Sequence, residues 1–168
     1  MITLRPVTPS DQDFVLELYA STRADLAALD CDPAMRRQLI HMQSEAQQAH
    51  YRGHYPRAQV SLVIDRDGNR IGRLYVDRGP HEIRLVDISL LPQHRRRGIG
   101  QLLLRALIAE GEQAALPVRL SVLAGNPAIH LYQRLGFEAD GMMGAHHSMA
   151  WRSETALADA GPDSISLL

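Results

Sequence analysis

The feature that most constrains this chain is a change from an apolar strand pattern to an amphipathic helix pattern between residues 83 and 107. Three arginines and two glycines lie at this change, as Arg95, Arg96, Arg97, Gly98, Ile99 and Gly100. The first N–H groups of a helix have no partner within the helix, and the helix dipole favours negative charge there. Glycine has no Cβ atom, so an anion can approach the main chain closely. Residues 95–100, here called the glycine turn, are therefore predicted to bind a pyrophosphate, with the arginines adding positive charge.

Two common phosphate-binding motifs do not match the glycine turn. A dinucleotide-binding fingerprint needs a third glycine where this chain has Leu103. A P-loop needs a lysine after its last glycine, where this chain has Gln101. The pattern that remains is R-x-x-G-x-G, and a second pattern, N-P-A-I-H-L-Y-Q-R-L-G-F, runs from Asn126 to Phe137. A predicted helix and a predicted strand separate the two patterns.

In this order and spacing, the two patterns resemble the motifs of the GNAT N-acetyltransferases. The first resembles the family's acyl-coenzyme A motif, Q/R-x-x-G-x-G/A, between a strand and a helix. The second resembles N-x-x-A-x-x-x-Y-x-x-x-G-F in rough form, with Ala128 one position early. The resemblance covers residues 2–152 in element order and residues 82–137 at motif level. It implies an α/β, single-domain GNAT-like fold with a mixed, mostly antiparallel central sheet flanked by helices and with splayed central parallel strands.

Upstream of the glycine turn, the patterning predicts two helices and a hairpin. Cap candidates at residues 8–11 precede an apolar stripe of Phe14, Val15, Leu18 and Tyr19. A second helix is predicted to end near Gly53, with an inner face marked by Met35, Leu39, Met42 and Ala46. Asp67 and Gly68 predict a tight turn between two strands.

The strand that leads into the glycine turn changes its apolar phase. Its apolar positions are Ile83 and Leu85 on one face, and then Val86, Ile88 and Leu90 on the other. Because strand side chains alternate with a period of two, this slip indicates either a β-bulge near residues 86–88 or burial of both faces. The resemblance implies the bulge, which would splay the strand from its neighbour and open a slot for a pantetheine arm.

Length and composition indicate one globular domain, predicted at residues 1–152 and followed by a tail at residues 153–168. The chain has 168 residues, of which 45% are hydrophobic, enough for a core of its own. A net charge of −1 argues against general nucleic-acid binding. No apolar run approaches the ~18 residues of a membrane span, and no signal-peptide pattern opens the chain, so we expect a soluble cytoplasmic protein without a membrane partner. His50 and His54 are four residues apart and could bind a metal if helical, but the glutamate of a zincin pattern is missing, so no metal is expected.

For the cofactor, the resemblance implies acetyl-CoA. The glycine turn would hold the pyrophosphate, mainly with backbone N–H groups. Ile88, Ser89 and Leu90 would pair with pantetheine amides along the strand edge. Asn126 would contact the cofactor arm, cap the helix that follows it, or do both.

For the chemistry, the resemblance implies transfer of an acetyl group from acetyl-CoA to a primary amine by direct attack within a ternary complex. Glu82 is the candidate general base or, alternatively, a solvated carboxylate at the head of the strand, and Asp87 is a second candidate base. Tyr132 is the candidate general acid for the leaving thiolate, or else a packing tyrosine. The alternative function is a non-catalytic acyl-CoA-binding sensor or scaffold, because the glycine turn would serve both. The acceptor, a small-molecule or peptide amine, stays open, and exposed sheet edges allow a homodimer.

Overall fold

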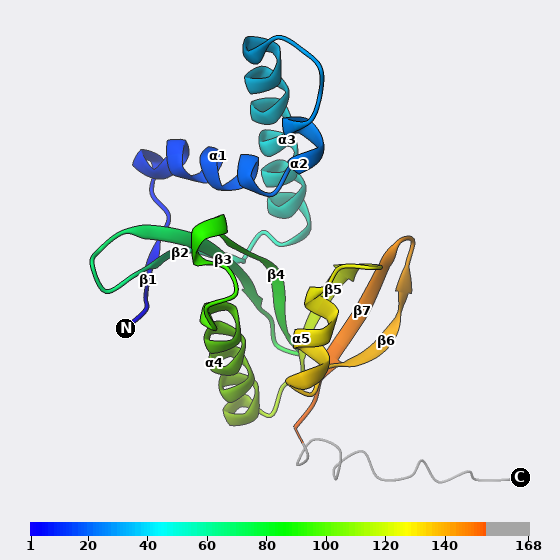
Figure 1. The fold of residues 1–168 in the computed structure, drawn as a ribbon. Helices are drawn as coiled ribbons and strands as arrows, with labels where there is room; N and C mark the ends of the chain where they lie inside the picture. The colour runs from blue at the N-terminus through cyan, green and yellow to red at the C-terminus, as the bar shows by residue number, and fades with distance from the viewer. Residues whose placement is uncertain (154–168) are drawn as a thin grey trace, which may run out of the picture. The chain divides into compact units, whose positions relative to one another are not determined.

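The computed structural model describes residues 1–153, so the predicted tail, apart from Ser153, lies outside the described residues. Seven strands form one mixed sheet in the order β1-β2-β3-β4-β5-β7-β6 (Figure 1). The strands are β1 (Thr3–Pro6), β2 (Gln59–Ile64), β3 (Arg70–Arg78), β4 (Ile83–Leu90), β5 (Val118–Leu123), β6 (Glu138–Met143) and β7 (His146–Trp151). The helices are α1 (Gln12–Ser21), α2 (Ala24–Ala27), α3 (Pro33–His54), α4 (Ile99–Ala114) and α5 (Ala128–Arg134), with 3₁₀ turns at Pro9–Asp11 and Pro92–His94. The predicted α/β class with a mixed, mostly antiparallel sheet is confirmed.

The chain forms two compact units, and each is described here by itself. The first joins Met1–Arg78 to Val86–Gly100, and the second joins Gly79–Leu85 to the chain from Gln101 onward. In the first unit, β1 pairs antiparallel with β2, and β2 pairs antiparallel with β3. The turn between β2 and β3 contains Gly68 at φ +84, whose N–H donates to the Asp65 carbonyl oxygen at 3.1 Å. The predicted hairpin is confirmed. Pro6 lies in β1, an edge strand of the sheet, which is where proline is tolerated in a strand.

The apolar stripe of α1 forms the core of the first unit. Phe14 and Leu18 are 4% and 1% exposed, and they cluster with the buried residues Leu62 of β2 and Leu91 after β4. Val15 and Tyr19 are also buried. The 3.6-residue period of the sequence therefore places α1 correctly, with its apolar face inward.

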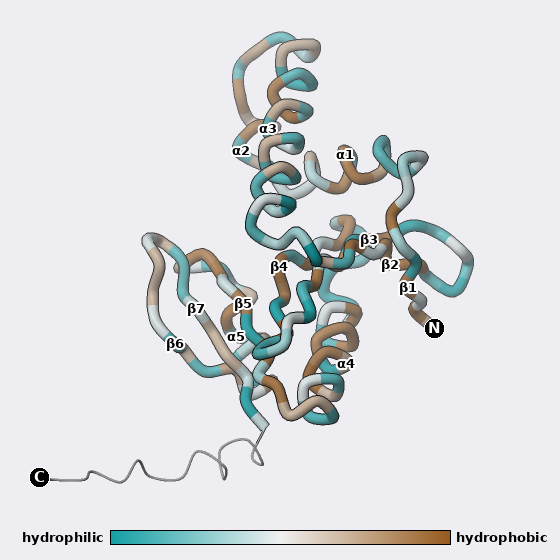
Figure 2. The backbone as a smooth tube through the Cα atoms, turned by 180° about the vertical axis from the view of Figure 1, so that it is seen from behind, coloured by the Kyte–Doolittle hydropathy of each residue, from teal (hydrophilic) through white to brown (hydrophobic). Residues whose placement is uncertain are grey.

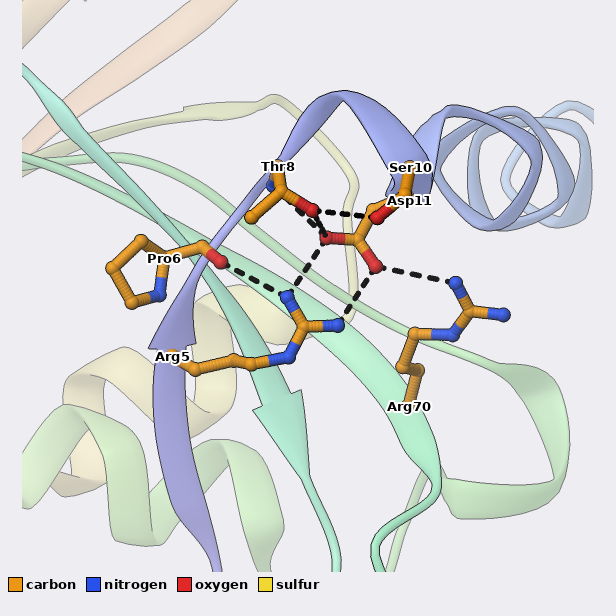
Figure 3. Close-up of polar contacts among 6 residues, drawn as sticks. All are labelled: Arg5, Pro6, Thr8, Ser10, Asp11 and Arg70. Carbon is orange, nitrogen blue, oxygen red and sulfur yellow. Dashed lines mark hydrogen bonds and ion pairs between the residues drawn. The ribbon is translucent and has the colours of Figure 1, made fainter.

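A buried carboxylate holds the start of α1 against the sheet. The carboxylate of Asp11, a residue only 1% exposed, accepts two hydrogen bonds from the guanidinium of Arg5, at 2.7 and 2.8 Å (Figure 3). It also accepts the backbone N–H and the hydroxyl of Thr8, both at 2.9 Å, and an Arg70 N–H at 3.2 Å (Figure 3). Residues of β1, the 3₁₀ turn and β3 thus meet at one ionised group, which is the arrangement that a buried charge requires.

We expect Asp11→Asn to lower stability at neutral pH and to make stability less sensitive to acid. The Arg5 guanidinium, followed by the Thr8 N–H, holds the pKa of Asp11 well below its ordinary value. A carboxyl whose pKa is lowered by folding stabilises the protein fully above its unfolded pKa, about 3.9, and loses that contribution as the pH falls further. Urea unfolding at several pH values should therefore show a gap between wild type and variant that narrows below about pH 4. Asp13→Asn, at an exposed carboxylate in α1, is the matched control, and a gap independent of pH would contradict the prediction.

The predicted inner face of α3 is wrong at three of its four positions. Met35 and Met42 are 56% and 57% exposed, and Ala46 is exposed as well. Leu39 is half-buried, as is Ile40, but the other inward positions are mostly polar: Arg36, Gln43, Ser44, Gln47, Gln48 and Tyr51. Figure 2 shows hydrophilic and hydrophobic residues mixed along the whole helix. The polar face turns inward because it meets polar partners there, among them Gln47 with Arg73 of β3.

The second unit is built on β5. Ile83–Leu85 of β4 pair in parallel with Val118–Leu120, and β5 pairs antiparallel with β7 along its whole length. β6 and β7 form an antiparallel hairpin, and all six residues of the edge strand β6 are exposed. In α4, a Cβ atom at Gly111 would lie 2.8 Å from Val118 and 2.9 Å from the Leu116 carbonyl oxygen. A glycine is therefore required where the helix approaches this strand.

The two explanations for the phase slip in β4 fare differently. Ile83 and Leu85 are buried, whereas every residue from 86 to 90 is only half-buried. Burial of both faces is therefore not observed, and the bulge near residues 86–88 stays a prediction.

Within residues 1–153, no helix is both long and apolar enough to cross a membrane.

Candidate functional site

The glycine turn joins the end of β4 to α4, as predicted. Leu91 anchors it from the first unit's core, and its N–H donates to the Ile71 carbonyl oxygen of β3 at 2.9 Å. One 3₁₀ turn follows, and the backbone then reverses through Arg96 at φ +59 and Gly98 at φ +78. Such dihedral angles are unfavourable for most residues but not for glycine. α4 begins at the next residue, Ile99.

The main chain of the glycine turn can accept an anion. A Cβ atom at Gly98 or at Gly100 would meet nothing within 4 Å, so open space lies over both. Among the residues described, the backbone N–H groups of residues 96–98 donate to no acceptor, and those of the first helical turn have no helical partner by geometry. The turn therefore has the donors and the space that a pyrophosphate needs, at the positive end of a helix dipole.

The arginines of the turn differ in what they contact. Arg95 turns its guanidinium back into the first unit, where Nε donates to the Leu90 carbonyl oxygen at 2.8 Å. Its Nη2 donates to the carbonyl oxygen and the hydroxyl of Ser21, at the end of α1, both at 3.2 Å. Arg96 and Arg97 are exposed, and the structure gives their side chains no ion pair in the described chain. The mobile positive charge predicted for the turn thus rests on Arg96 and Arg97, while Arg95 fixes the turn in place.

The three predicted pantetheine-binding residues of β4 lie directly before the turn. Ile88, Ser89 and Leu90 are half-buried, and the Ser89 hydroxyl donates to Asp87 at 3.0 Å. A Cβ atom on Gly72 of β3 would lie 2.4 Å from the Ser89 carbonyl oxygen and 3.3 Å from the Leu90 Cα. Only glycine at position 72 permits this approach, so Gly72 positions the strand that leads into the turn. The sequence analysis missed it, although a glycine inside a strand indicates such an approach.

Asn126, in the second unit, acts as a cap. Its side-chain oxygen accepts the Ala128 N–H at 2.9 Å, at the start of α5. The helix itself begins at Ala128, one residue later than a cap at Asn126 implies, which is within the usual uncertainty of helix ends. The capping role is confirmed, and contact with a cofactor stays a prediction.

Tyr132 is the buried residue of α5. It is 8% exposed, and its ring lies edge-on to that of Phe137, with centroids 5.9 Å apart and planes at 62°. Leu131 and Leu135, the two neighbouring leucines, are only half-buried. The ring contact supports the packing role, which is compatible with a hydroxyl that gives up a proton.

Glu82 is held by two arginines of the second unit. Its Oε1 accepts a hydrogen bond from Arg84 Nε at 2.8 Å, and its Oε2 forms an ion pair with Arg119 Nε at 3.0 Å. Arg119 also pairs with Asp140, whose pKa its guanidinium lowers. A simple solvated carboxylate is therefore not what the structure shows, because both oxygens are bonded.

The predicted site residues thus fall into two groups. Residues 88–90 and the glycine turn are brought together in the first unit, while Glu82, Asn126 and Tyr132 belong to the second. Asp87 is in the first unit, where its Oδ2 accepts a hydrogen bond from Arg73 at 2.8 Å. Arg73 was missed by the sequence analysis because nothing in the pattern of β3 marks an arginine that is 5% exposed. Among the described residues, no three or more His, Cys, Asp or Glu side chains come together as a group that could hold a metal ion.

A strand, a glycine turn whose N–H groups meet no acceptor among the described residues, and a helix N-terminus form the main-chain arrangement with which α/β proteins bind phosphate groups. Residues 57–139 match the family model of the acetyltransferase (GNAT) domain. The matched residues include the glycine turn and the second motif, in agreement with the family recognised in the two motifs. The comparison with curated proteins gives no significant match.

Solved structures with the same fold include three acetyltransferases. One is PaiA N-acetyltransferase from Thermoplasma acidophilum in complex with coenzyme A, at 18% identity and a TM-score of 0.67, covering 91% of this chain and 99% of that one. Another is an acetyltransferase from Thermus thermophilus, at 18% identity and a TM-score of 0.66, covering 91% and 97%. The third is a chimera of spermidine N-acetyltransferase SpeG from Vibrio cholerae and hSSAT, at 24% identity and a TM-score of 0.63, covering 93% and 98%. At these identities the likeness establishes the fold.

Proposed function

We propose that the protein is an N-acetyltransferase that transfers an acetyl group from acetyl-CoA to a primary amine by direct attack in a ternary complex. The observation that carries the proposal is the glycine turn, where open space over Gly98 and Gly100 meets free backbone N–H groups at the start of α4. In a chain that matches the family model of the GNAT acetyltransferase domain, this turn is the natural place for the pyrophosphate of coenzyme A.

Each proposed residue then has a defined task. When bound, acetyl-CoA supplies the acetyl thioester. Residues 88–90 orient it through backbone groups of β4, and Asn126 adds a contact to its arm. Glu82, directly or through a water molecule, takes a proton from the attacking amine, and Tyr132 gives a proton to the departing thiolate. The new C–N bond replaces the C–S bond, and the two proton transfers leave an amide and a free thiol.

Thiol release tests the proposal. The protein is mixed with acetyl-CoA and a panel of primary amines, and free coenzyme A is followed against a reaction without amine. Amine-dependent release with an acetylated product supports the enzyme. Tight binding of acetyl-CoA with no release for any amine would instead identify the alternative, a sensor or scaffold that binds acyl-CoA without turnover.

We expect Glu82→Gln to lower turnover by about 10²–10⁴-fold, the usual contribution of a general base. The amide cannot accept a proton, whereas its size preserves the packing. Rates are measured across a pH range with both substrates saturating. Glu138→Gln, at an exposed carboxylate of β6, is the control and should leave the rate unchanged. An unaltered rate and pH profile in Glu82→Gln would move the role to Asp87, to a water molecule or to the acceptor's own deprotonation.

A further inference from the structure

The inward face of α3 is polar where an apolar face was available on the same helix. Met35 and Met42 lie outside, while Gln47 and Tyr51 face β3. Polar side chains buried between a helix and a sheet cost free energy unless they find hydrogen-bond partners. This orientation therefore needs an explanation beyond packing.

Residues of α3 contact residues of β3 in pairs along the two elements. Gln47 accepts an Arg73 N–H at 3.3 Å, and the Tyr51 ring lies 5.2 Å from the Tyr75 ring, edge to face. Four residues of helix rise about 6 Å and two residues of strand about 6.6 Å, so the two elements advance together. Asp77 is the next residue on the same face of β3, and Tyr55 directly follows the end of α3. We call these residues, with Asp87 beside them, the α3–β3 polar layer; its members are Gln47, Tyr51, Tyr55, Arg73, Tyr75, Asp77 and Asp87.

Several polar atoms of the layer have no partner in the described chain. Arg73 is 5% exposed, yet its Nε donates to nothing, and the buried Oδ1 of Asp77 accepts nothing. The hydroxyl groups of Tyr51 and Tyr75 form no hydrogen bond within residues 1–153 either. Buried groups of this kind are normally satisfied, so each unpaired one calls for a water molecule or a ligand. The layer thus offers both donors and acceptors.

The charges of the layer balance only when a neighbouring arginine is counted. Within the layer, Arg73 faces Asp87, and Asp77 is a second acidic group. Arg52 of α3, an exposed residue outside the layer, lies close enough to act electrostatically on Tyr75 and adds the second positive charge. Burial, together with the nearby charge of Asp87, raises the pKa of Tyr51 to about 12, so its hydroxyl keeps its proton at neutral pH. The layer therefore suits a ligand with neutral groups that both donate and accept hydrogen bonds.

The layer adjoins the proposed cofactor-binding strand. Asp87 accepts hydrogen bonds from Arg73 and from Ser89, at 2.8 and 3.0 Å, and Ser89 is one of the residues proposed to orient the cofactor. A ligand held at the layer would lie beside that strand. This is where an acceptor must be, if the proposed function holds.

We propose that the α3–β3 polar layer recognises the acceptor, and that the acceptor is a polyhydroxylated amine, such as an amino sugar, rather than an alkyl or aryl amine. This inference rests on the proposed acetyl transfer. Hydroxyl groups would accept from Arg73 Nε and from the tyrosines and donate to Asp77. A site with unpaired buried donors and acceptors rejects a ligand that cannot bond them, by factors that can exceed 10².

The test compares two amines with the same six-membered ring, glucosamine and cyclohexylamine, by thiol release at saturating acetyl-CoA. We expect kcat/KM to be at least ~10²-fold higher for glucosamine. Equal values, a preference for cyclohexylamine, or acetylation of other panel amines but not of glucosamine would overturn the inference. If no amine at all releases thiol, the proposed function fails. In that case, calorimetry measures whether glucosamine binds to the coenzyme A-loaded protein. Binding would support recognition of a polyhydroxylated amine by the layer, and no binding would overturn it.

Two variants of α3 test whether the acceptor binds at the layer. Tyr51→Phe removes a hydroxyl that has no partner in the described chain, so the fold should be preserved, and KM for glucosamine should rise about tenfold with KM for acetyl-CoA unchanged. Gln47→Leu should act in the same direction. Gln38→Leu, on the exposed side of the same helix, is the matched control and should change neither constant. A glucosamine KM unaffected by both Tyr51→Phe and Gln47→Leu, in folded protein, would overturn the assignment.

Discussion

Replacing Tyr132 by phenylalanine is expected to lower turnover at least ~10²-fold while leaving the affinity for acetyl-CoA nearly unchanged. Phenylalanine keeps the ring, and with it the edge-on contact to Phe137 at 5.9 Å. What the variant lacks is the phenol proton, which tyrosine retains at neutral pH and can give to a leaving thiolate. The loss should therefore appear in kcat, measured under conditions in which chemistry is shown to limit the rate.

A control separates proton donation from packing. Phe137→Leu disturbs the ring contact but leaves the Tyr132 hydroxyl in place, so it should lower thermal stability and spare turnover per folded molecule. If Tyr132→Phe turns over at nearly the wild-type rate, Tyr132 is a packing residue and the proton must come from elsewhere.

Gly98→Asp is expected to weaken acetyl-CoA binding by at least ~10²-fold. The new carboxylate would occupy the open space over Gly98 and repel a phosphate that the turn's N–H groups would otherwise bind. Hydrogen bonds to a charged group contribute about 1.5–3 kcal/mol, and each 1.4 kcal/mol is a factor of ten in affinity. Gly100→Asp should have the same effect without a positive φ at the substituted position. Both are measured by calorimetry on protein whose folding has been checked.

The matched control is Gly68→Asp in the β2–β3 hairpin. Gly68 has φ +84 and open space around its missing Cβ, like Gly98 at φ +78, so the two substitutions share their backbone cost and their charge. Aspartate tolerates this region of dihedral space better than most residues, which favours folding in both variants. Unchanged affinity in Gly98→Asp, or equal losses in both variants, would show that the turn is not the pyrophosphate site.

Local patterns in the sequence were sufficient for the parts of the fold that depend on neighbours along the chain. The stripe of α1, the turn at Gly68 and the glycine turn all follow from residues within a few positions of one another. The face of α3 does not, because the side it buries is decided by Arg73 and Asp87, which lie on strands far along the chain. Hydrophobicity alone predicts that the face with the methionines is buried. The hydrogen-bond partners of the polar face turn that face inward instead.

The same limit applies to the candidate site. Glu82 could be chosen as a base from its place directly before β4, but its ion pair with Arg119 reaches to β5, the neighbouring parallel strand. No pattern of neighbouring residues in the sequence predicts this ion pair. Similarly, three consecutive arginines look alike in a sequence, and only the fold separates Arg95 from the two that follow it.

Arg95 illustrates why a motif position is not defined by its charge. Its guanidinium reaches three oxygen atoms on two segments, one at Leu90 and the other at Ser21, 74 residues earlier in the chain. Lysine would carry the same charge to the same place, but a single ammonium on a flexible stem does not reproduce the planar fork that meets both segments at once. An exchange that looks conservative in an alignment would thus free the end of α1 from the start of the glycine turn. Geometry, rather than electrostatics, is what this position demands of its residue.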